Sequence, residues 1–120
     1  MKTRFLRDIE VSEVGMGCMA FSHGYGQIPS EAYSIEAIRN AYDHGCTFFD
    51  TAEVYSPNLS GIGHNELIVG KALKDVRKDV VIATKLMLPG PGFSIKICSP
   101  SALPADPAPR MRWRISPSFC

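Results

Sequence analysis

Hydrophobic and polar residues are arranged along the first part of the chain in short blocks, and these blocks predict alternating strands and helices. Around Ile9 and Val11 apolar and polar residues alternate with period two, which predicts a hairpin of two short strands over about 3–6 and 9–14. Residues 46–52 form a short β-rich run. Residues 79–85 form a nearly unbroken β-branched run, typical of a strand covered on both faces.

Two segments between these runs carry hydrophobic residues every three or four positions, which predicts two amphipathic helices. The first is expected over about 34–44, with Ser34 as its N-cap and Gly45 as its stop. The second is expected over about 65–76, with Asn65 as its N-cap. Strands that alternate with helices predict an α/β fold of parallel βαβ units, with the hairpin as a separate cap.

The pattern changes abruptly near Pro89. Seven of the nine prolines follow, and Lys and Arg outnumber acidic residues there by four to one. Because proline interrupts helices and central strands, we expect residues 89–120 to be disordered, beside a folded portion over 1–88. One nucleotide sequence that can encode Ile95–Cys98, when it is preceded by a G and read one base earlier, encodes Asp-Lys-Asp-Leu instead. We therefore weigh the hypothesis that the tail is out of frame, against truncation or a genuine variant.

Composition restricts the partners more than the fold. The net charge of +1 gives no reason to expect nucleic acid or an anionic membrane as a partner. The four cysteines are widely separated, which favours a reduced, cytoplasmic chain over a disulfide framework or a zinc site. The first residues lack the apolar core of a signal peptide, and no run approaches the ~20 apolar residues of a membrane span.

Three polar residues lie at the ends of neighbouring predicted strands or just after them. Asp50 lies at the end of one strand, Tyr55 lies in the loop after it, and Lys85 ends the next strand. In parallel α/β folds ligands bind beyond the carboxyl ends of the strands, so we expect all three side chains at one rim. Taken singly, each has a plain structural reading: a strand-end acid, a packed loop aromatic and a solvated lysine.

Together these residue types suit acid catalysis. A tyrosine hydroxyl has an ordinary pKa near 10, a neighbouring ammonium favours its ionised form, and a carboxylate can hold that ammonium charged and oriented. Tyr55, Lys85 and Asp50 could therefore form a general acid that protonates a carbonyl oxygen while a hydride reaches the carbonyl carbon. The hydride must come from a cofactor.

Four separated motifs, RFLRDIEVSEVGMGCMAF, GCTFFDTAEVYS, HNELIVGKAL and DVVIATK, agree in order and spacing with one family. In these motifs the chain, from about Arg4 to Leu88, resembles the N-terminal portion of an aldo/keto reductase. The resemblance implies part of a TIM-type (β/α)8 barrel, with the opening hairpin and about three βα units. It also implies NADPH-dependent reduction of aldehydes and ketones, and a small-molecule carbonyl compound as the partner.

The resemblance also assigns residues. Asp50, Tyr55 and Lys85 match the family's catalytic Asp, Tyr and Lys, with Tyr55 as the proton donor. Gly17 and Cys18, together with Asp50, fall where the family's first loop and catalytic acid approach the nicotinamide. No metal site is implied.

The family's catalytic histidine has no counterpart, because nothing after Leu88 matches the family. We therefore expect this chain to be an inactive, truncated copy whose last strand, at 79–85, has an unpaired edge. The alternative is a non-catalytic barrel relative that acts as a binding or regulatory subunit, as the family's channel β-subunits do. His23 and His64 lie in loops near the same rim, where exposed loop imidazoles are the simpler reading. Substrate identity and oligomeric state cannot be read from the sequence.

Overall fold

A computed structural model describes residues 1–24, 26–57, 61–87 and 93–98. Its first element is the predicted hairpin, in which β1 (Thr3–Leu6) pairs antiparallel with β2 (Ile9–Ser12). Arg7 lies in the turn with φ of 58°, a left-handed conformation that lets the strands reverse direction. The second strand ends at Ser12 instead of the expected residue 14.

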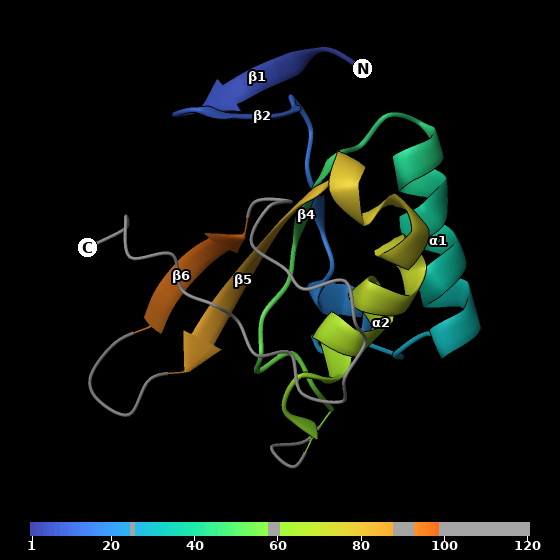
Figure 1. Ribbon diagram of the computed structural model, residues 1–120. Helices are drawn as coiled ribbons and strands as arrows, with labels where there is room; N and C mark the ends of the chain where they lie inside the picture. Colours follow the sequence, from blue (N-terminus) through green and yellow to red (C-terminus); the bar gives the residue numbers. More distant parts are fainter. Residues whose placement is uncertain (25, 58–60, 88–92, 99–120) are drawn as a thin grey trace.

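The second sheet has the order β3-β4-β5-β6 (Figure 1). Strands β3 (Met16–Gly17), β4 (Phe48–Asp50) and β5 (Val81–Met87) run parallel, and Gly17, Asp50 and Ala83 lie opposite one another. The predicted parallel βαβ arrangement is therefore present. β5 begins and ends two residues later than its predicted range.

Strand β6 (Phe93–Cys98) corrects two expectations. It pairs antiparallel with β5, from Ile82 opposite Cys98 to Met87 opposite Phe93. The edge of β5 is therefore paired from Ile82 to Met87. The proline-rich tail contributes a strand at Phe93–Cys98. An edge strand tolerates nearby prolines because only one of its sides needs hydrogen bonds. The expected disorder after Cys98 lies outside the described residues.

Two α-helices cover one face of this sheet, as Figure 1 shows. Helix α1 spans Glu31–Asp43 and helix α2 spans His64–Leu73. Short 3₁₀ helices accompany them, among them η1 (Met19–Phe21) after β3 and η3 (Lys74–Asp79) after α2.

Both predicted N-caps are wrong. Helix α1 begins three residues before the expected start, because the side chain of Ser30 accepts from the backbone amide of Tyr33. Ser34 lies inside the helix, where its hydroxyl donates to the Ser30 carbonyl. Helix α2 is preceded by Gly63 in the left-handed region, with φ of 82°, and Asn65, the second residue of the helix, is fully buried.

The hydrophobic core lies between the sheet and the two helices. Phe49 in β4 and Ile82 in β5 point toward the helices, and Ile38 of α1 is fully buried against them. Because side chains alternate along a strand, the neighbours of Phe49 and Ile82 face the opposite side of the sheet. The remaining buried residues of the core are Cys18, Cys46, Ile68, Val69, Ala72, Leu73 and Val80.

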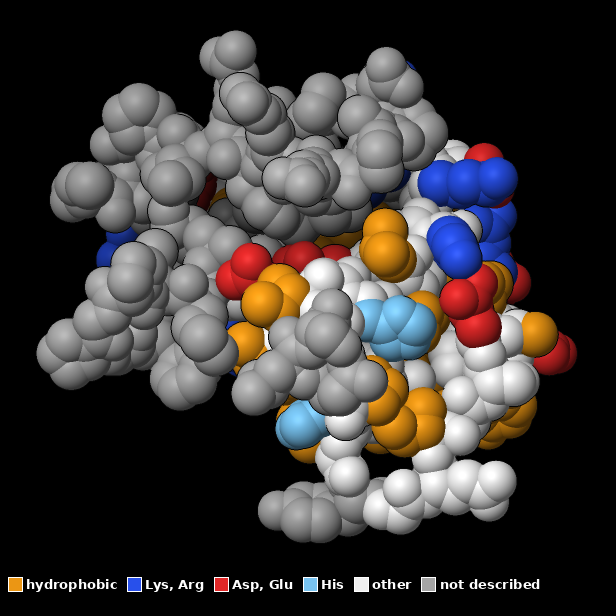
Figure 2. All heavy atoms as spheres, turned by 90° about the horizontal axis from the view of Figure 1, so that it is seen from below, with side chains coloured by type: hydrophobic (Ala, Val, Ile, Leu, Met, Phe, Trp, Pro, Cys, Tyr) orange, Lys and Arg blue, Asp and Glu red, His pale blue; other side chains and the backbone are white. Residues whose placement is uncertain are grey.

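The hairpin is joined to the start of β4. The Thr47 hydroxyl accepts from the Ser12 amide, and the Ser12 hydroxyl accepts from the Thr47 amide, both at 2.9 Å. The hairpin therefore lies at the end where the parallel strands begin. The opposite end, where those strands finish, is left to the loops that carry the candidate site. Figure 2 views the molecule from below, where histidine and acidic side chains reach the surface among hydrophobic ones.

Candidate active site

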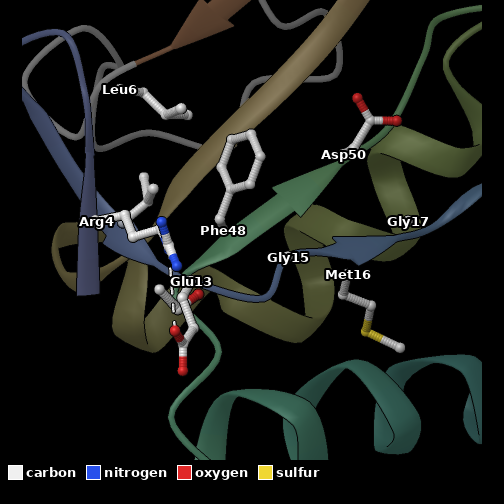
Figure 3. Close-up of a pocket in the computed structure, with 10 residues that line it drawn as sticks. Arg4, Leu6, Glu13, Gly15, Met16, Gly17, Phe48 and Asp50 are labelled. Atoms are coloured by element: carbon white, nitrogen blue, oxygen red, sulfur yellow. Dashed lines mark ion pairs between the residues drawn. The ribbon is translucent and has the colours of Figure 1, made fainter. Parts of the chain in front are cut away.

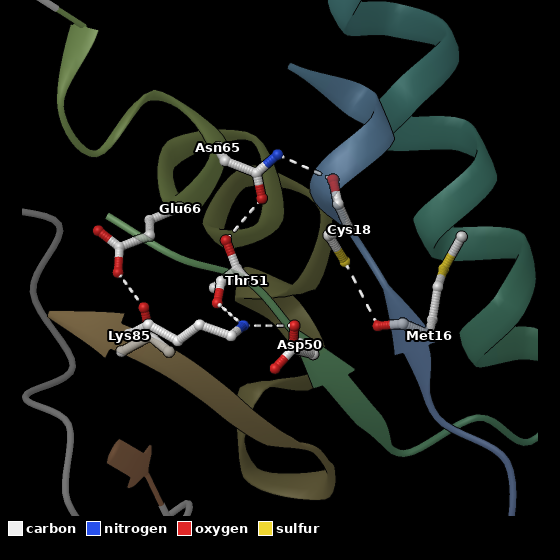
Figure 4. Close-up of polar contacts among 8 residues, drawn as sticks. Met16, Cys18, Asp50, Thr51, Asn65, Glu66 and Lys85 are labelled. Atoms are coloured by element: carbon white, nitrogen blue, oxygen red, sulfur yellow. Dashed lines mark hydrogen bonds and ion pairs between the residues drawn. The ribbon is translucent and has the colours of Figure 1, made fainter. Parts of the chain in front are cut away.

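Lys85 and Asp50 form a close ion pair between adjacent strands. The Lys85 Nζ donates to Asp50 Oδ1 at 2.6 Å and to the Thr51 carbonyl at 2.9 Å (Figure 4). Asp50 pairs with Ala83 in the β4–β5 register, and Lys85 lies two residues beyond Ala83, on the same face of the sheet. The predicted meeting of these two side chains at one rim is confirmed.

Tyr55 lies in the loop that follows β4, and its ring faces the same ammonium. The Lys85 Nζ is 5.1 Å from the centroid of the Tyr55 ring, within the range of a cation–π contact. Two backbone hydrogen bonds hold the loop in place. The Glu53 amide donates to the Lys85 carbonyl at 3.1 Å, and the Tyr55 amide donates to the Ala52 carbonyl at 3.2 Å. The structure therefore brings together all three predicted catalytic side chains.

The environment of Lys85 keeps its ammonium charged. Burial by itself lowers the pKa of Lys85, but hydrogen bonds and charge interactions with Asp50 and Tyr55 outweigh it, so that the pKa is raised above 10.5. A permanent positive charge beside a tyrosine ring is the electrostatic condition for stabilising a phenolate. The trio can therefore support proton transfer from Tyr55.

Asn65 is a site residue that the sequence reasoning misassigned as a helix cap. Its Oδ1 accepts from the Thr51 hydroxyl at 2.5 Å, and its Nδ2 donates to the Cys18 carbonyl at 2.9 Å and to Ser22 Oγ at 2.6 Å. Figure 4 shows it pointing from α2 between β4 and the segment after β3. One buried amide thus joins three segments that surround the site.

Two of the residues with an expected cofactor role, Gly17 and Cys18, lie at the end of β3. A Cβ added to Gly17 would meet nothing within 4 Å, so the strand end leaves open space beside Asp50. Cys18 is fully buried, and burial with the nearby Asp50 charge raises the pKa of its thiol to about 12. Its amide donates to the Asp50 carbonyl and its carbonyl accepts from Asn65, so this residue fixes the chain path next to Gly17.

A cavity of about 340 Å³ opens between the hairpin and the ends of β3 and β4 (Figure 3). Gly17 and Asp50 line one end of it, whereas Tyr55 and Lys85 are not among its lining residues. The cavity therefore reaches Asp50 from the hairpin side. Its other lining residues are Arg4, Leu6, Val11, Ser12, Glu13, Gly15, Met16 and Phe48.

A buried carboxyl, that of Glu66, lies beside the strand that carries Lys85. Glu66 of α2 accepts from the hydroxyl of Thr84, the residue before Lys85, at 2.5 Å. Burial raises the pKa of Glu66, the Thr84 hydrogen bond lowers it, and the Glu53 charge raises it further, with a net rise. Glu66 is an acidic residue in the first turn of α2.

Within the described part of the chain, no group of three or more His, Cys, Asp and Glu side chains is placed to hold a metal ion. Over the same residues, no helix has the length and apolar character needed to cross a membrane.

Comparison with known proteins gives one consistent result. A sequence model described as "Aldo/keto reductase family" matches residues 13–104. A Glycine max protein named as a probable aldo-keto reductase is 45% identical over 85 residues, which are 70% of this chain and 23% of that protein.

Solved structures agree with these sequence matches. An aldo-keto reductase from Bacillus halodurans, in its holo form, superposes with a TM-score of 0.57 at 31% identity, over 78% of this chain and 30% of its own. A Pseudomonas aeruginosa protein described as an aldo-keto reductase gives a TM-score of 0.56 at 24% identity, over 78% of this chain and 35% of its own. This second likeness shows the fold alone.

Two facts follow from the lengths of these matches. The chain spans between about a quarter and a third of the relatives it matches. The family match also continues to residue 104, past Leu88, where the resemblance was expected to end. The expectation that nothing after Leu88 matches is therefore wrong.

Proposed function

This chain belongs to the aldo/keto reductase family, and from that premise we propose that it carries the proton-donating part of an NADPH-dependent reductase of aldehydes and ketones. Tyr55 is the proposed proton donor, Lys85 stabilises the phenolate that Tyr55 leaves behind, and Asp50 holds Lys85 in place. The observation that carries the proposal is the position of the Lys85 Nζ, 2.6 Å from Asp50 Oδ1 and 5.1 Å from the Tyr55 ring centroid.

The proposed reaction divides between cofactor and protein. NADPH, when bound, supplies the hydride that reaches the carbonyl carbon. The proton of the Tyr55 hydroxyl goes to the carbonyl oxygen, so the product is an alcohol. Because the Lys85 ammonium interacts more strongly with a phenolate than with a neutral phenol, it lowers the energy of the state in which the proton has left.

The described residues are compatible with the nicotinamide end of the cofactor. Open space beside Gly17, at the carboxyl end of β3, leaves room for a ring next to Asp50. Cys18 would contribute by fixing the backbone there, since its thiol is buried and its backbone groups are already bonded. We assign Gly17, Cys18 and Asp50 to this end on those grounds.

We propose that the protein is cytoplasmic, because its described thiols are in the reduced state. Cys18 and Cys46 are both free and buried, an arrangement that suits a reducing compartment.

The direct test uses the 120-residue chain with NADPH and 4-nitrobenzaldehyde, beside the Tyr55→Phe variant. NADPH binding is followed by the fluorescence of the dihydronicotinamide, and turnover by its loss of absorbance. Turnover in the parent chain that falls by at least about 100-fold in Tyr55→Phe would support proton donation by Tyr55 and refute the expected inactivity, because a positioned general acid contributes about that much. Equal rates for the two chains, or no binding of NADPH, would contradict the proposal.

The same assay separates the alternatives. The inactivity expected from the sequence stays a prediction, and the result it foresees is neither NADPH binding nor turnover. A binding or regulatory subunit would instead bind NADPH without turnover, and no observation on the described residues favours such a role.

A further inference from the structure

Two consecutive residues after β3 bind two consecutive carbonyls in the Tyr55 loop. The Ser22 hydroxyl donates to the Tyr55 carbonyl at 2.8 Å, and His23 Nδ1 lies 2.9 Å from the Ser56 carbonyl. Because a carbonyl only accepts, a hydrogen bond here requires a proton on Nδ1 of His23. These paired contacts join the β3–α1 connection to the segment that holds the proposed proton donor.

Asn65 fixes the direction of the first of these bonds. Its Nδ2 donates to Ser22 Oγ at 2.6 Å, so the Ser22 hydroxyl must give its own proton to another acceptor, and the Tyr55 carbonyl receives it. Both Asn65 and Ser22 are fully buried, which excludes competing water. The chain of donors therefore runs one way, from α2 to the Tyr55 backbone.

The His23 ring also packs on the Tyr55 ring. The two planes are inclined by only 9°, and their centroids are 6.1 Å apart, an offset stack within the usual range for aromatic pairs. The Lys85 ammonium lies 5.1 Å from the centroid of the same Tyr55 ring. His23 therefore contacts both the backbone next to Tyr55 and the ring that faces Lys85.

We propose that His23 is a positioning residue that, with Ser22, holds the Tyr55 ring against the Lys85 ammonium. The assignment rests on the proposed function for the importance of Tyr55, but the contacts that define it are independent of any cofactor or substrate. His23 acts through Tyr55 and is not itself a catalytic residue. The sequence predicts an exposed loop imidazole at His23. His23 is exposed, but its ring also stacks on Tyr55, which the sequence did not predict.

The test is NMR spectroscopy of the 120-residue chain with ¹³C-labelled tyrosine rings, the Tyr55 signals being assigned from Tyr55→Phe. In the parent chain we expect nuclear Overhauser effects from the Tyr55 ring to the His23 ring and to the end of the Lys85 side chain. In His23→Ala we expect loss of the Tyr55–Lys85 effect, with a thermal midpoint within about 3 °C of the parent because His23 is exposed. His23→Phe keeps an aromatic ring for stacking and should restore the Tyr55–Lys85 effect at least in part.

His44→Ala is the matched control. His44 is also exposed, and its Nδ1 also lies near a backbone carbonyl, that of Asn40 at 2.8 Å, but it closes helix α1 away from Tyr55. We expect this variant to leave the Tyr55 ring signals unchanged. Absence of a His23–Tyr55 effect in the parent chain, or a Tyr55–Lys85 effect that survives in His23→Ala, would overturn the inference. Neither result depends on turnover, so failure of the enzyme assay contradicts the proposed function and leaves this inference standing.

Discussion

Lys85 and Asp50, thirty-five positions apart in the sequence, meet with 2.6 Å between Nζ and Oδ1. Their meeting follows from the parallel register of β4 and β5. This register places Asp50, the last residue of β4, opposite Ala83, so that Lys85 lies close to the carboxyl end of β4. The sheet thus determines where the charges lie, and the loop after β4 adds Tyr55 to them. An acid–base group is assembled from two strands and one loop.

Removal of the Asp50 charge should destabilise the fold modestly. In Asp50→Asn the Lys85 ammonium, whose side chain is 23% exposed, loses its anionic partner, and we expect the free energy of unfolding to fall by about 1 kcal/mol. Urea unfolding measures the change. Glu13→Gln is the control, because it removes the longer 3.9 Å pair with the exposed Arg4 and should cost less than about 0.5 kcal/mol. Equal effects of the two substitutions would contradict a special role for the Asp50 pair.

Asn65→Asp should be the more damaging change, although the two side chains have nearly the same shape. A carboxylate cannot donate to the Cys18 carbonyl or to Ser22 Oγ, and it places a charge at a fully buried position. We expect the free energy of unfolding to fall by roughly 2–4 kcal/mol. Asn40→Asp, on the exposed side of α1, should change it by less than about 0.5 kcal/mol. A tolerated Asn65→Asp in the same urea titration would show that the buried amide network is not formed.

Glu66 predicts a pH dependence of stability with a definite sign. Burial raises its pKa above the ordinary 4.5 in the folded chain, against the opposing Thr84 hydrogen bond. The folded chain therefore binds this proton more tightly than the unfolded chain, so this group's contribution to the free energy of unfolding falls as pH rises from about 4.5 through the raised pKa. Glu66→Gln keeps an acceptor for Thr84 and removes the charge.

We therefore expect Glu66→Gln to become more stable relative to the parent chain between about pH 4 and about pH 8. Urea unfolding across this range gives the difference at each pH. Glu36→Gln, at an exposed position of α1, controls for loss of a surface acid. A difference between Glu66→Gln and the parent that stays constant with pH would refute the assignment.

Cys18 should resist alkylation in the folded chain. Its thiol is fully buried, and its pKa of about 12 leaves almost no thiolate at about pH 8. After treatment with iodoacetamide, peptide mass spectrometry should find Cys18 unmodified in native buffer and fully modified in urea. Equal labelling of Cys18 under both conditions would mean that the β3 end is open, contrary to the structure.

How far the sequence predicted this molecule depends on the kind of signal involved. Strands β4 and β5 and both helices could be predicted, because hydrophobic period reports directly on which face is buried, whereas the two residues of β3 are too few to show a period. Ser34 and Asn65 were misread as caps because cap preference cannot distinguish the residue that starts a helix from a polar residue within its first turns. The strand at Phe93–Cys98 does alternate apolar and polar residues, but the surrounding prolines outweighed that signal.

The candidate site divides in the same way. Asp50 and Lys85 could be placed together because parallel strands end at a common edge. The stacking of His23 on Tyr55 could not be predicted, because it joins two loops whose paths depend on the buried hydrogen bonds of Asn65 and Ser22. Such side-chain hydrogen bonds do not produce a periodic pattern in the sequence.

The central claim is that Asp50, Tyr55 and Lys85 act as one coupled acid–base group, and titration of Lys85 by NMR of its ¹³Cε signal tests it most directly. The parent chain should give a pKa for Lys85 above 10.5, with lower values in both Asp50→Asn and Tyr55→Phe, because each removes an interaction that raises it. Lys71→Gln, at an exposed pair with Glu31, should leave the titration of Lys85 unchanged. A Lys85 pKa that is the same in the parent chain, Asp50→Asn and Tyr55→Phe would contradict the account.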